Sequence, residues 1–464
     1  MLCPEDLTRR KFIGNACAAV GATGLLSALA QLRMIGAVAG DAARTTSGSS
    51  DYKALVCVFL YGGNDSNNVV IPYDNSSYNI YAAARTALAL PQANLLPITP
   101  ASYSDGRKWS LHPAFVEVQS LFNAGTLGIM GNTGTLTAPV TLSQYNAGTG
   151  SVPPQLFSHA DQQVQWQSSI PDQPFQTGWG GRLADMVEAL NTNTQISMSI
   201  SVAGQNSFQV GNTVSQYAVS PSGAVTISGT TGSTLNTTRY ATQQNLLNQQ
   251  EANLFQAAFA NLTGSAISDS TLLTSILTNA TTLQTKFPNT SLATQLQMIA
   301  RLISAAPQLG LKRQVFFASL GGWDLHTGEL PAHVTLLAQV SQALNAFNNA
   351  TVELGVANQV TTFTASDFSR TFNTNGDGSD HGWGSHHLVM GGAVKGGDIY
   401  GKMPSLILGG PDDTGRGRWI PSTSVDQYSA TLASWFGVSA TNLPTVLPNI
   451  GRFASSNLGF MSGT

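Results

Sequence analysis

Residues 53–60 read KALVCVFL and lead directly into Tyr61-Gly62-Gly63-Asn64-Asp65. An apolar run of this length, without polar alternation, is typical of a β-strand buried on both faces, as in a parallel sheet covered by helices. Further apolar runs follow at 126–131 and 314–320, and a β-branched run follows at 359–364. We therefore expect these four segments to be strands of one buried, mostly parallel sheet.

Helical patterns separate these runs. Apolar residues recur at helical spacing in the segments 114–122, 240–262, 293–308, 332–354 and 426–437. Strands that alternate with helices in this way predict an α/β fold. We expect a three-layer sandwich, in which a mostly parallel sheet has helices on both faces.

The middle of the chain has a different composition. Residues 197–203 and 207–229 alternate apolar side chains with Ser, Thr and Gly, which indicates edge or exposed β-structure. Ser, Thr and Asn dominate 205–240 and 262–290. We interpret these polar stretches as surface insertions.

The chain of 464 residues is long enough for more than one domain. We find no internal repeat and expect a single α/β domain over 50–462 with an insertion around 190–290. The alternative is two domains joined near 190–240.

The first forty residues have the pattern of an export signal. Arg9-Arg10 precede an apolar stretch rich in Ala and Gly, and Ala37-Val38-Ala39 supplies small residues for cleavage. Paired arginines are typical of the twin-arginine route. We expect residues 1–40 to be a signal peptide recognised by the twin-arginine translocase, and the mature protein to be periplasmic or secreted. The alternative is an amphipathic helix that stays attached.

Composition excludes several classes of protein. Charged residues make up 10% of the chain, the net charge is −3, and no cluster of Lys and Arg occurs after the leader, so we expect no nucleic-acid surface. No segment after the leader is apolar over the roughly 18 residues that a membrane span needs. Cys57 is the one cysteine after the leader, and we expect a buried thiol and no disulfide in the mature chain.

Polar side chains follow three of the predicted strands. Asp65 follows the first strand, Asp324 and His326 follow the third, and Asp367 follows the fourth. In open parallel sheets, ligand sites gather at the carboxyl ends of the strands, so we expect these side chains to share a site. The competing explanation is that loops favour Asp for their turns.

A glycine-rich run carries further imidazoles. Residues 376–387 read GDGSDHGWGSHH and hold three of the seven histidines. Imidazole with carboxylate suits Zn, Mn or Fe, whereas carboxylate alone favours Mg or Ca. We expect a divalent metal (Zn, Mn, Fe or Ca) to be held by ligands drawn from Asp65, Asp324, His326, Asp380, His381, His386 and His387. The alternative is a surface loop whose Asp and His make turn hydrogen bonds.

Three further residues are candidates for chemistry. Ser158 is a candidate nucleophile, because a hydroxyl next to a metal loses its proton more readily. The alternative is that Ser158 caps a helix over 159–167. Arg182 and Arg370 are candidates for holding an anionic group, and each is also explicable as an ordinary surface or salt-bridged cation.

Six motifs, in matching order, resemble the secreted "domain of unknown function 1501" proteins. The motifs are YGGND (61–65), LHP (111–113), SH (158–159), GWGGR (178–182), GGWDLH (321–326) and DHGWG (380–384). Together with the twin-arginine leader, the resemblance covers nearly all of the chain.

That family is similar to the alkaline phosphatase and sulfatase superfamily, which implies a three-layer fold and a two-metal site. In chain order the resemblance implies Asp65 as an early acid, Ser158 as the nucleophile, Asp324 with His326 as a spaced pair, Asp380-His381 as an adjacent pair, and His386 or His387 as the last ligand. The spacing between Asp324 and His326 is shorter than is usual in the superfamily.

Two functions are consistent with the sequence. The first is an exported metal-dependent hydrolase of a phosphate or sulfate ester, in which Ser158 attacks phosphorus or sulfur. The second is a non-catalytic envelope protein that uses the fold to bind a glycan or a protein partner, in keeping with its low charge. The expected ligand is therefore a small anionic ester or a glycan.

Overall fold

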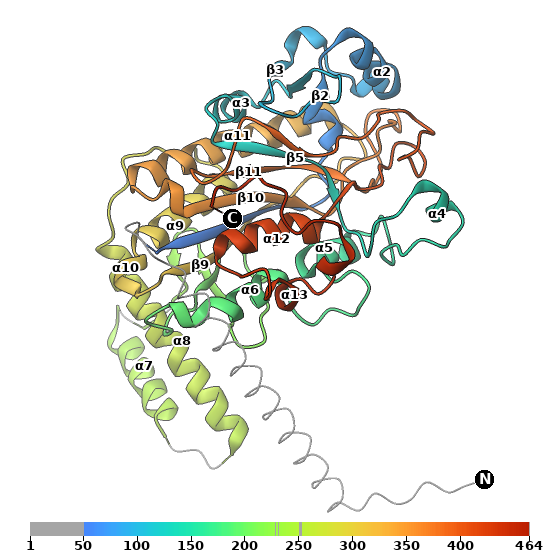
Figure 1. The fold of residues 1–464 in the computed structure, drawn as a ribbon. Coiled ribbons are helices and arrows are strands. Elements are labelled where there is room, and N and C mark those ends of the chain that lie inside the picture. The colour runs from blue at the N-terminus through green and yellow to red at the C-terminus, as the bar shows by residue number, and fades with distance from the viewer. Residues whose placement is uncertain (1–50, 228, 231, 250–252, 464) are drawn as a thin grey trace, which may run out of the picture.

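The structure is a computed structural model that describes residues 51–463 apart from 228, 231 and 250–252 (Figure 1). The signal peptide expected at 1–40 lies outside the described residues.

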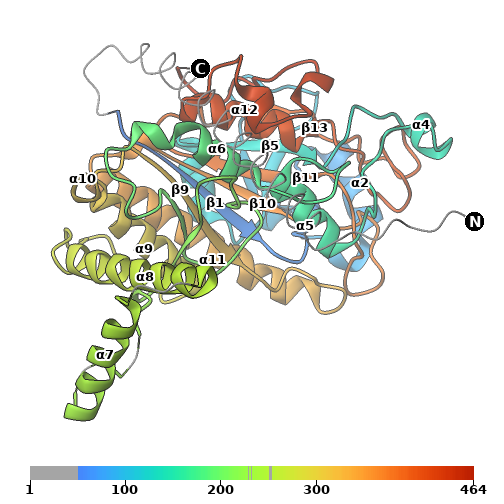
Figure 2. The same cartoon turned by 90° about the horizontal axis from the view of Figure 1, so that it is seen from below.

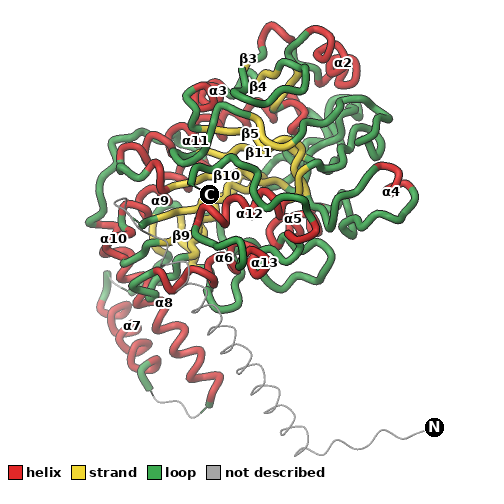
Figure 3. Tube along the Cα trace, viewed as in Figure 1, coloured by secondary structure: helices red, strands yellow, loops and turns green. Residues whose placement is uncertain are grey.

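A large sheet forms the centre of the molecule (Figure 3). Its strands in the described part of the chain are β1 (Lys53–Leu60), β5 (Leu127–Gly134), β6 (Ser199–Ser201), β7 (Tyr217–Ser220), β8 (Gly223–Ala224), β9 (Arg313–Leu320), β10 (Val360–Ser366), β11 (Ser385–Met390), β12 (Ile399–Gly401) and β13 (Thr423–Ser424). The strand order is β12-β5-β11-β10-β1-β9-β6-β7-β8, and β13 also pairs with β5.

Strand β1 lies inside the sheet and pairs in parallel with both β9 and β10. Its residues 54–60 are all buried, which is the reason that the run contains no polar alternation. The pairs β6–β9, β6–β7, β5–β12 and β5–β13 are also parallel, whereas β11 is antiparallel to β5 and β10, and β8 to β7. The prediction of a mostly parallel sheet is confirmed.

Helices cover both faces of this sheet (Figure 2). On one face lie α9 (Ser291–Ser304), α10 (Ala306–Leu309) and α11 (Glu329–Glu353), and on the other lie α5 (His159–Ser168), α6 (Trp179–Val187) and α12 (Val425–Phe436). The helix α3 (Val116–Asn123) packs against α11, and α13 (Leu443–Val446) packs against α6 and α12. The three-layer α/β prediction is confirmed. Within the described ranges, no helix is both long and apolar enough to cross a membrane.

A small antiparallel sheet lies beside the main one, and the helix next to it ends in a buried arginine. It consists of β2 (Val70–Pro72), β3 (Leu96–Ile98) and β4 (Trp109–Leu111), next to α2 (Asn75–Arg85). The side chain of Asp74 caps α2 by accepting a hydrogen bond from the Ser77 amide. The helix ends at Arg85, whose side chain is wholly buried.

The insertion contains a helical hairpin that projects from the body of the molecule (Figure 1). It consists of α7 (Thr234–Leu247) and α8 (Leu254–Thr278). The prediction of one helix over 240–262 is therefore wrong. The periodic pattern continues through the break, but Asn253 starts a new helix because its side chain accepts hydrogen bonds from the amides of Phe255 and Gln256. The division of the chain into a single domain stays a prediction.

Candidate metal centre

Side chains from three parts of the chain meet beyond the carboxyl ends of β9 and β10. Asp324 and His326 follow β9, His381 lies between β10 and β11, and His159 is the first residue of α5. One ligand atom from each of His159, Asp324 and His381 lies within 4.8 Å of the other two. His326 Nε2 lies 3.0 Å from His381 Nε2 and 3.1 Å from Asp324 Oδ1. We call these four residues the imidazole cluster.

Each imidazole of the cluster is held from behind through its Nδ1 atom. The partners are Asp367 Oδ2 for His159 at 2.7 Å, Asp380 Oδ1 for His326 at 3.2 Å, and the Phe157 carbonyl oxygen for His381 at 2.7 Å. A carbonyl only accepts hydrogen bonds, so His381 Nδ1 carries the proton and its neutral Nε2 presents a lone pair. Carboxylates fix the other two rings in the same sense. A histidine that binds metal is held in this way by an acceptor behind it.

The Nε2 atoms face one another at separations that a shared proton or a metal ion would fit. His159 Nε2 lies 3.1 Å from His381 Nε2 and 3.4 Å from Asp324 Oδ1. At this distance two unprotonated ring nitrogens and a carboxylate repel each other. Ligands about 2.0 Å from a tetrahedral metal ion lie roughly 3.3 Å from each other, so the observed separations match a metal site. A set of imidazoles with one carboxylate fits Zn, Mn or Fe.

Arg370 keeps the carboxylate of the cluster ionised. Its Nη1 donates to Asp324 Oδ1 at 2.7 Å and to the Gly62 carbonyl at 3.2 Å. Burial on its own raises the pKa of Asp324, but the hydrogen bond and charge of Arg370 outweigh it and the pKa is lowered. The Arg370 side chain is wholly buried, whereas that of Asp324 is 47% exposed. The cluster is therefore open to solvent on the Asp324 side and backed by a cation.

The imidazoles of His159 and His381 differ in basicity. The hydrogen bond to Asp367 raises the pKa of His159, and burial lowers the pKa of His381. Gln163 Nε2 also donates to Asp367 Oδ2 at 2.8 Å and fixes that carboxylate. Of these two rings, His159 is therefore the one that takes up a proton more readily.

The structure brings together four residues of the predicted ligand set. Asp324, His326 and His381 belong to the cluster, and Asp380 lies behind His326, where it also pairs with Arg416 Nη1. That these residues bind metal stays a prediction.

Asp65 lies apart from these residues, which corrects the expectation that it joins them. Its carboxylate pairs with Arg85 Nη2, and the same Nη2 atom lies 3.2 Å from Glu329 Oε1. The side chains of all three residues are buried. Asp65 already has a cation, which its sequence context does not reveal because Arg85 belongs to a different element.

His386 and His387 also lie apart from the cluster. Both are buried on β11, at an irregularity in its pairing with β5. His386 Nδ1 accepts a hydrogen bond from the Asn132 amide at 3.0 Å, and the His387 ring lies 5.0 Å from that of Trp166. Burial lowers the pKa of each to about 3. They are neutral residues of the core, which corrects the expectation of a last ligand here.

Ser158 and Arg182 make contacts of other kinds. The Ser158 hydroxyl donates to Asp161 Oδ2 at 2.5 Å, and although Ser158 occupies the N-cap position of α5, its side chain makes no capping bond. The Arg182 guanidinium donates to the carbonyls of Val446, Thr177 and Ser168 at 2.6–2.8 Å. Arg182 therefore fastens α6 to its neighbours and is not directed at an anion.

His159 is the residue that sequence reasoning missed. It directly follows Ser158 in the SH motif, in which Ser158 alone is predicted to have a chemical role. Its partner Asp367 is 208 residues away in the chain, and Arg416 and Arg418 beside the cluster lie in a loop without a recognisable motif.

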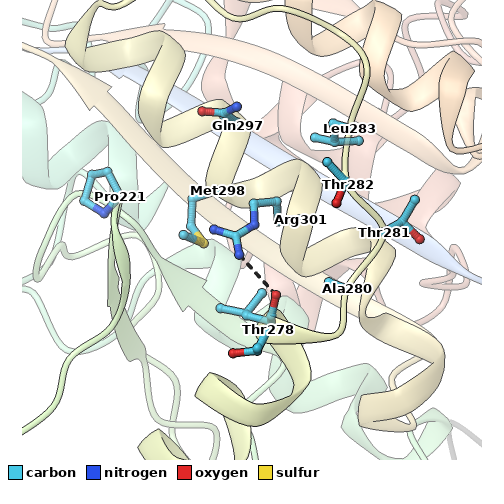
Figure 4. Close-up of a pocket in the computed structure, with 10 residues that line it drawn as sticks. Pro221, Thr278, Ala280, Thr281, Thr282, Leu283, Gln297, Met298 and Arg301 are labelled. Atoms are coloured by element: carbon cyan, nitrogen blue, oxygen red, sulfur yellow. Dashed lines mark hydrogen bonds between the residues drawn. The ribbon is translucent and has the colours of Figure 1, made fainter.

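A cavity of about 380 Å³ lies between the end of α8 and α9 (Figure 4). Arg301 is the one charged residue of its lining, and its Nη2 donates to the Leu277 carbonyl at 3.1 Å. No residue of the imidazole cluster lines this cavity. We therefore place the candidate site at the cluster.

A protein-family model described as "Protein of unknown function (DUF1501)" matches residues 52–413. The comparison with curated proteins finds no match. Among solved structures, the chain is similar to the PsFucS1 sulfatase from Pseudoalteromonas sp., with 10% identity, 89% of this chain and 73% of that chain covered, and a TM-score of 0.37. It is also similar to BT1596, a 2-O GAG sulfatase, with 9% identity, 86% and 74% covered, and a TM-score of 0.32. We base no statement about the site on similarities this distant.

Proposed function

The chain belongs to the DUF1501 family, and from the geometry of its site we propose that it is an exported, metal-dependent hydrolase of sulfate or phosphate esters. One observation carries the proposal. Three imidazoles, each fixed through Nδ1, present their Nε2 atoms toward one another and toward Asp324 Oδ1.

His159, Asp324 and His381 would hold the metal ion, with His326 as a further ligand on the side of Asp380. Zn, Mn or Fe fits this donor set, and Ca does not, because Ca prefers an all-oxygen shell. When bound, such an ion supplies a Lewis acid that neutralises charge on an ester oxygen and lowers the pKa of a coordinated hydroxyl.

Cationic side chains beside the cluster favour an anionic substrate. Arg370 donates to Asp324, and Arg416 pairs with Asp380 while its side chain stays 43% exposed. Arg418 Nε donates to the His381 carbonyl at 2.8 Å, and its guanidinium lies over the Phe157 ring at 4.7 Å. Guanidinium groups match the paired oxygens of a sulfate or phosphate group. We assign the binding of these oxygens to the Arg416 side of the cluster.

Ser158 remains our proposed nucleophile, and its hydroxyl, with a pKa lowered by the bound metal ion, would lose its proton to solvent. The support is position and hydrogen bonding: Ser158 directly precedes His159, and its hydroxyl donates to the Asp161 carboxylate. Attack on the ester requires the Ser158 side chain to turn from Asp161 toward the cluster. A Ser158→Ala variant that keeps full turnover would assign the nucleophile to water.

We also propose that residues 1–40 direct export through the twin-arginine translocase. The support is the sequence of the paired Arg9-Arg10 and the small residues at 37–39. Replacing both arginines by lysine is expected to retain the protein in the cytoplasm, which cell fractionation measures.

Turnover of aryl sulfates and aryl phosphates by the zinc- or manganese-loaded full chain tests the hydrolase. We expect hydrolysis that a chelator abolishes and that His381→Ala reduces by about a hundredfold or more. Asp105→Asn is the matched control, because Asp105 pairs with Arg107 on the surface. Absence of turnover on every ester tested, by protein that holds its metal, would contradict the proposal.

One observation favours a second function, a non-catalytic binding protein. The projecting hairpin exposes Leu254, Phe255 and Phe259 of α8, and Phe255 is 87% exposed. Apolar side chains in this number are typical of a surface for a partner. A pure binder would keep its partner affinity in the His381→Ala variant, whereas the hydrolase would lose turnover.

A further inference from the structure

Arg85 is a buried cation held between two carboxyl groups. Its Nη2 contacts Asp65 Oδ2 and lies 3.2 Å from Glu329 Oε1. Its Nη1 donates to the carbonyls of Thr371 and Phe372 at 3.0 and 3.2 Å. The side chains of Arg85 and Glu329 are wholly inaccessible, and that of Asp65 nearly so.

The charges of this group balance without any ion from solution. Burial, followed by the charge of Asp65, raises the pKa of Glu329 well above its usual value, so this carboxyl is protonated at neutral pH. Glu329 also accepts a hydrogen bond from the Ser379 hydroxyl. One guanidinium therefore neutralises one carboxylate.

We infer that Arg85 is an internal cation that occupies the place of a metal ion beside Asp65, so that, of these two places in the described part of the chain, only the imidazole cluster holds metal. The metal at the cluster rests on the proposed function. The occupation of the Asp65 pocket by Arg85 does not.

The same arginine fastens the loop that carries part of the cluster. Thr371, which accepts from Arg85, follows Arg370, and Ser379, which donates to Glu329, precedes Asp380-His381. Arg85 is thus a positioning residue for both ends of this loop and has no direct contact with Asp324 or the imidazoles among its described hydrogen bonds.

We expect that removal of the guanidinium would leave a cation site whose preferred metal ion differs from that of the imidazole cluster. A divalent ion between an ionised Asp65 and an ionised Glu329 would give this buried group the same net charge as it has now with Arg85. Glu329 would release one proton when the ion binds. The donors there are the two carboxylates and the Ser379 hydroxyl, an all-oxygen set that suits Ca rather than Zn. Calcium therefore reports on the Asp65 pocket and zinc on the imidazole cluster.

The experiment uses calcium chloride as the probe and the His381→Ala chain as the background, which removes a cluster ligand. Arg85→Ala is added to this background, and Arg85→Lys serves as its charge-retaining control. A second control combines Asp65→Asn with Arg85→Met, which removes both charges and leaves no buried ion unpaired. Thermal unfolding and calorimetric titration are measured with and without about 2 mM calcium, after treatment with a chelator.

We expect calcium to raise the Tm of the Arg85→Ala chain by about 3 °C or more and to bind at about one equivalent. Refolding of that variant only when calcium is present supports the same conclusion. The background chain and both controls should show no calcium effect.

An Arg85→Ala chain that binds no more calcium than the background overturns the inference. So does an Arg85→Ala chain that stays unfolded with calcium while the Asp65→Asn, Arg85→Met chain folds. Failure of the proposed function is seen separately, as the absence of zinc from the wild-type chain.

Discussion

At the scale of single residues, the acceptors behind the imidazoles set the properties of the candidate site. Asp367 fixes His159 through Nδ1 and is itself held by Gln163 Nε2 and by the Gly62 amide at 3.3 Å. This carboxylate is buried and lies on the far side of His159 from the cluster. We expect it to orient the ring and to increase its basicity without binding the metal.

Replacing Asp367 by Asn is expected to lower zinc affinity by about ten- to a hundredfold, because the ring loses its ionic acceptor. Competition with a chromogenic chelator measures the affinity. Asp105→Asn, a surface change, should leave it unchanged. Equal affinities in the wild-type and Asp367→Asn chains would contradict the role that we give Asp367.

The pH dependence of zinc binding follows from the same hydrogen bond. Asp367 raises the pKa of His159 above its usual value, so the proton and the metal compete for Nε2 at a higher pH than for a free imidazole. Affinity should therefore begin to fall as the pH drops through this raised pKa. In the Asp367→Asn chain the fall should begin at a lower pH, which the same competition measurement at several pH values detects.

The sequence allowed some of these residues to be predicted and hid others for physical reasons. Asp324 and His326 directly follow a buried strand, and Asp380-His381 lie in a glycine-rich loop, so local pattern was enough to select them. The capture of Asp65 by Arg85 depends on a helix outside the main sheet. The role of His159 depends on Asp367, which only the folded chain brings near it.

At the scale of elements, strands were more predictable than helix ends. β1 is almost entirely apolar, β9 contains the apolar run VFFA, and β10 is rich in β-branched residues, and all three lie buried inside the sheet. The sequence predicts one helix over 240–262 where the structure has α7 and α8. Both helices are only weakly amphipathic, and the helical spacing of apolar residues continues across the cap at Asn253, so the sequence pattern does not mark the end of α7.

In the loop between β10 and β11, the backbone beside His381 closely approaches the segment that carries Arg370. Gly382 donates to the Ser369 carbonyl at 2.7 Å, and a Cβ there would lie 2.7 Å from the Arg370 carbonyl oxygen. Gly382→Ala should push apart the segments that carry Arg370 and His381. We expect a loss of about 1–3 kcal/mol in stability and weaker zinc binding, measured by denaturant unfolding and chelator competition.

Gly264 is the matched control for that change. It lies inside α8, and a Cβ there meets nothing within 4 Å. Gly264→Ala should leave zinc binding unchanged and stabilise the chain by about 0.5–1 kcal/mol, because alanine favours the helix. If Gly382→Ala behaved like Gly264→Ala, the close approach would not matter.

At the scale of the whole molecule, buried titratable groups predict how stability depends on pH. Outside the imidazole cluster, burial is the largest cause that lowers the pKa of four histidines, to about 3 for His112, His386 and His387 and to about 4 for His333. These rings take up protons below pH 6.5 only when the chain unfolds, which destabilises the fold as the pH falls. Burial raises the pKa of Asp426 to about 7 and also raises the pKa of Glu329. These two acids each release a proton when the chain unfolds, so they oppose the effect of the histidines on stability.

The four histidines outnumber the two acids, so unfolding near pH 5.5 should take up about two protons. The free energy of unfolding should then fall by about 2 kcal/mol for each pH unit between roughly pH 6 and 5. Denaturant unfolding of chelator-treated protein at several pH values measures this slope. A stability that is flat or rises across this range would show that the histidines are protonated in the folded chain.

The metal content of the purified chain tests the central claim most directly. After chelation and dialysis against zinc, elemental analysis of the wild-type protein should find about one equivalent, and the His381→Ala protein less than about 0.2 equivalents. X-ray absorption should show nitrogen and oxygen neighbours at about 2.0–2.1 Å. A wild-type chain that holds less than about 0.2 equivalents of any divalent metal would contradict the account.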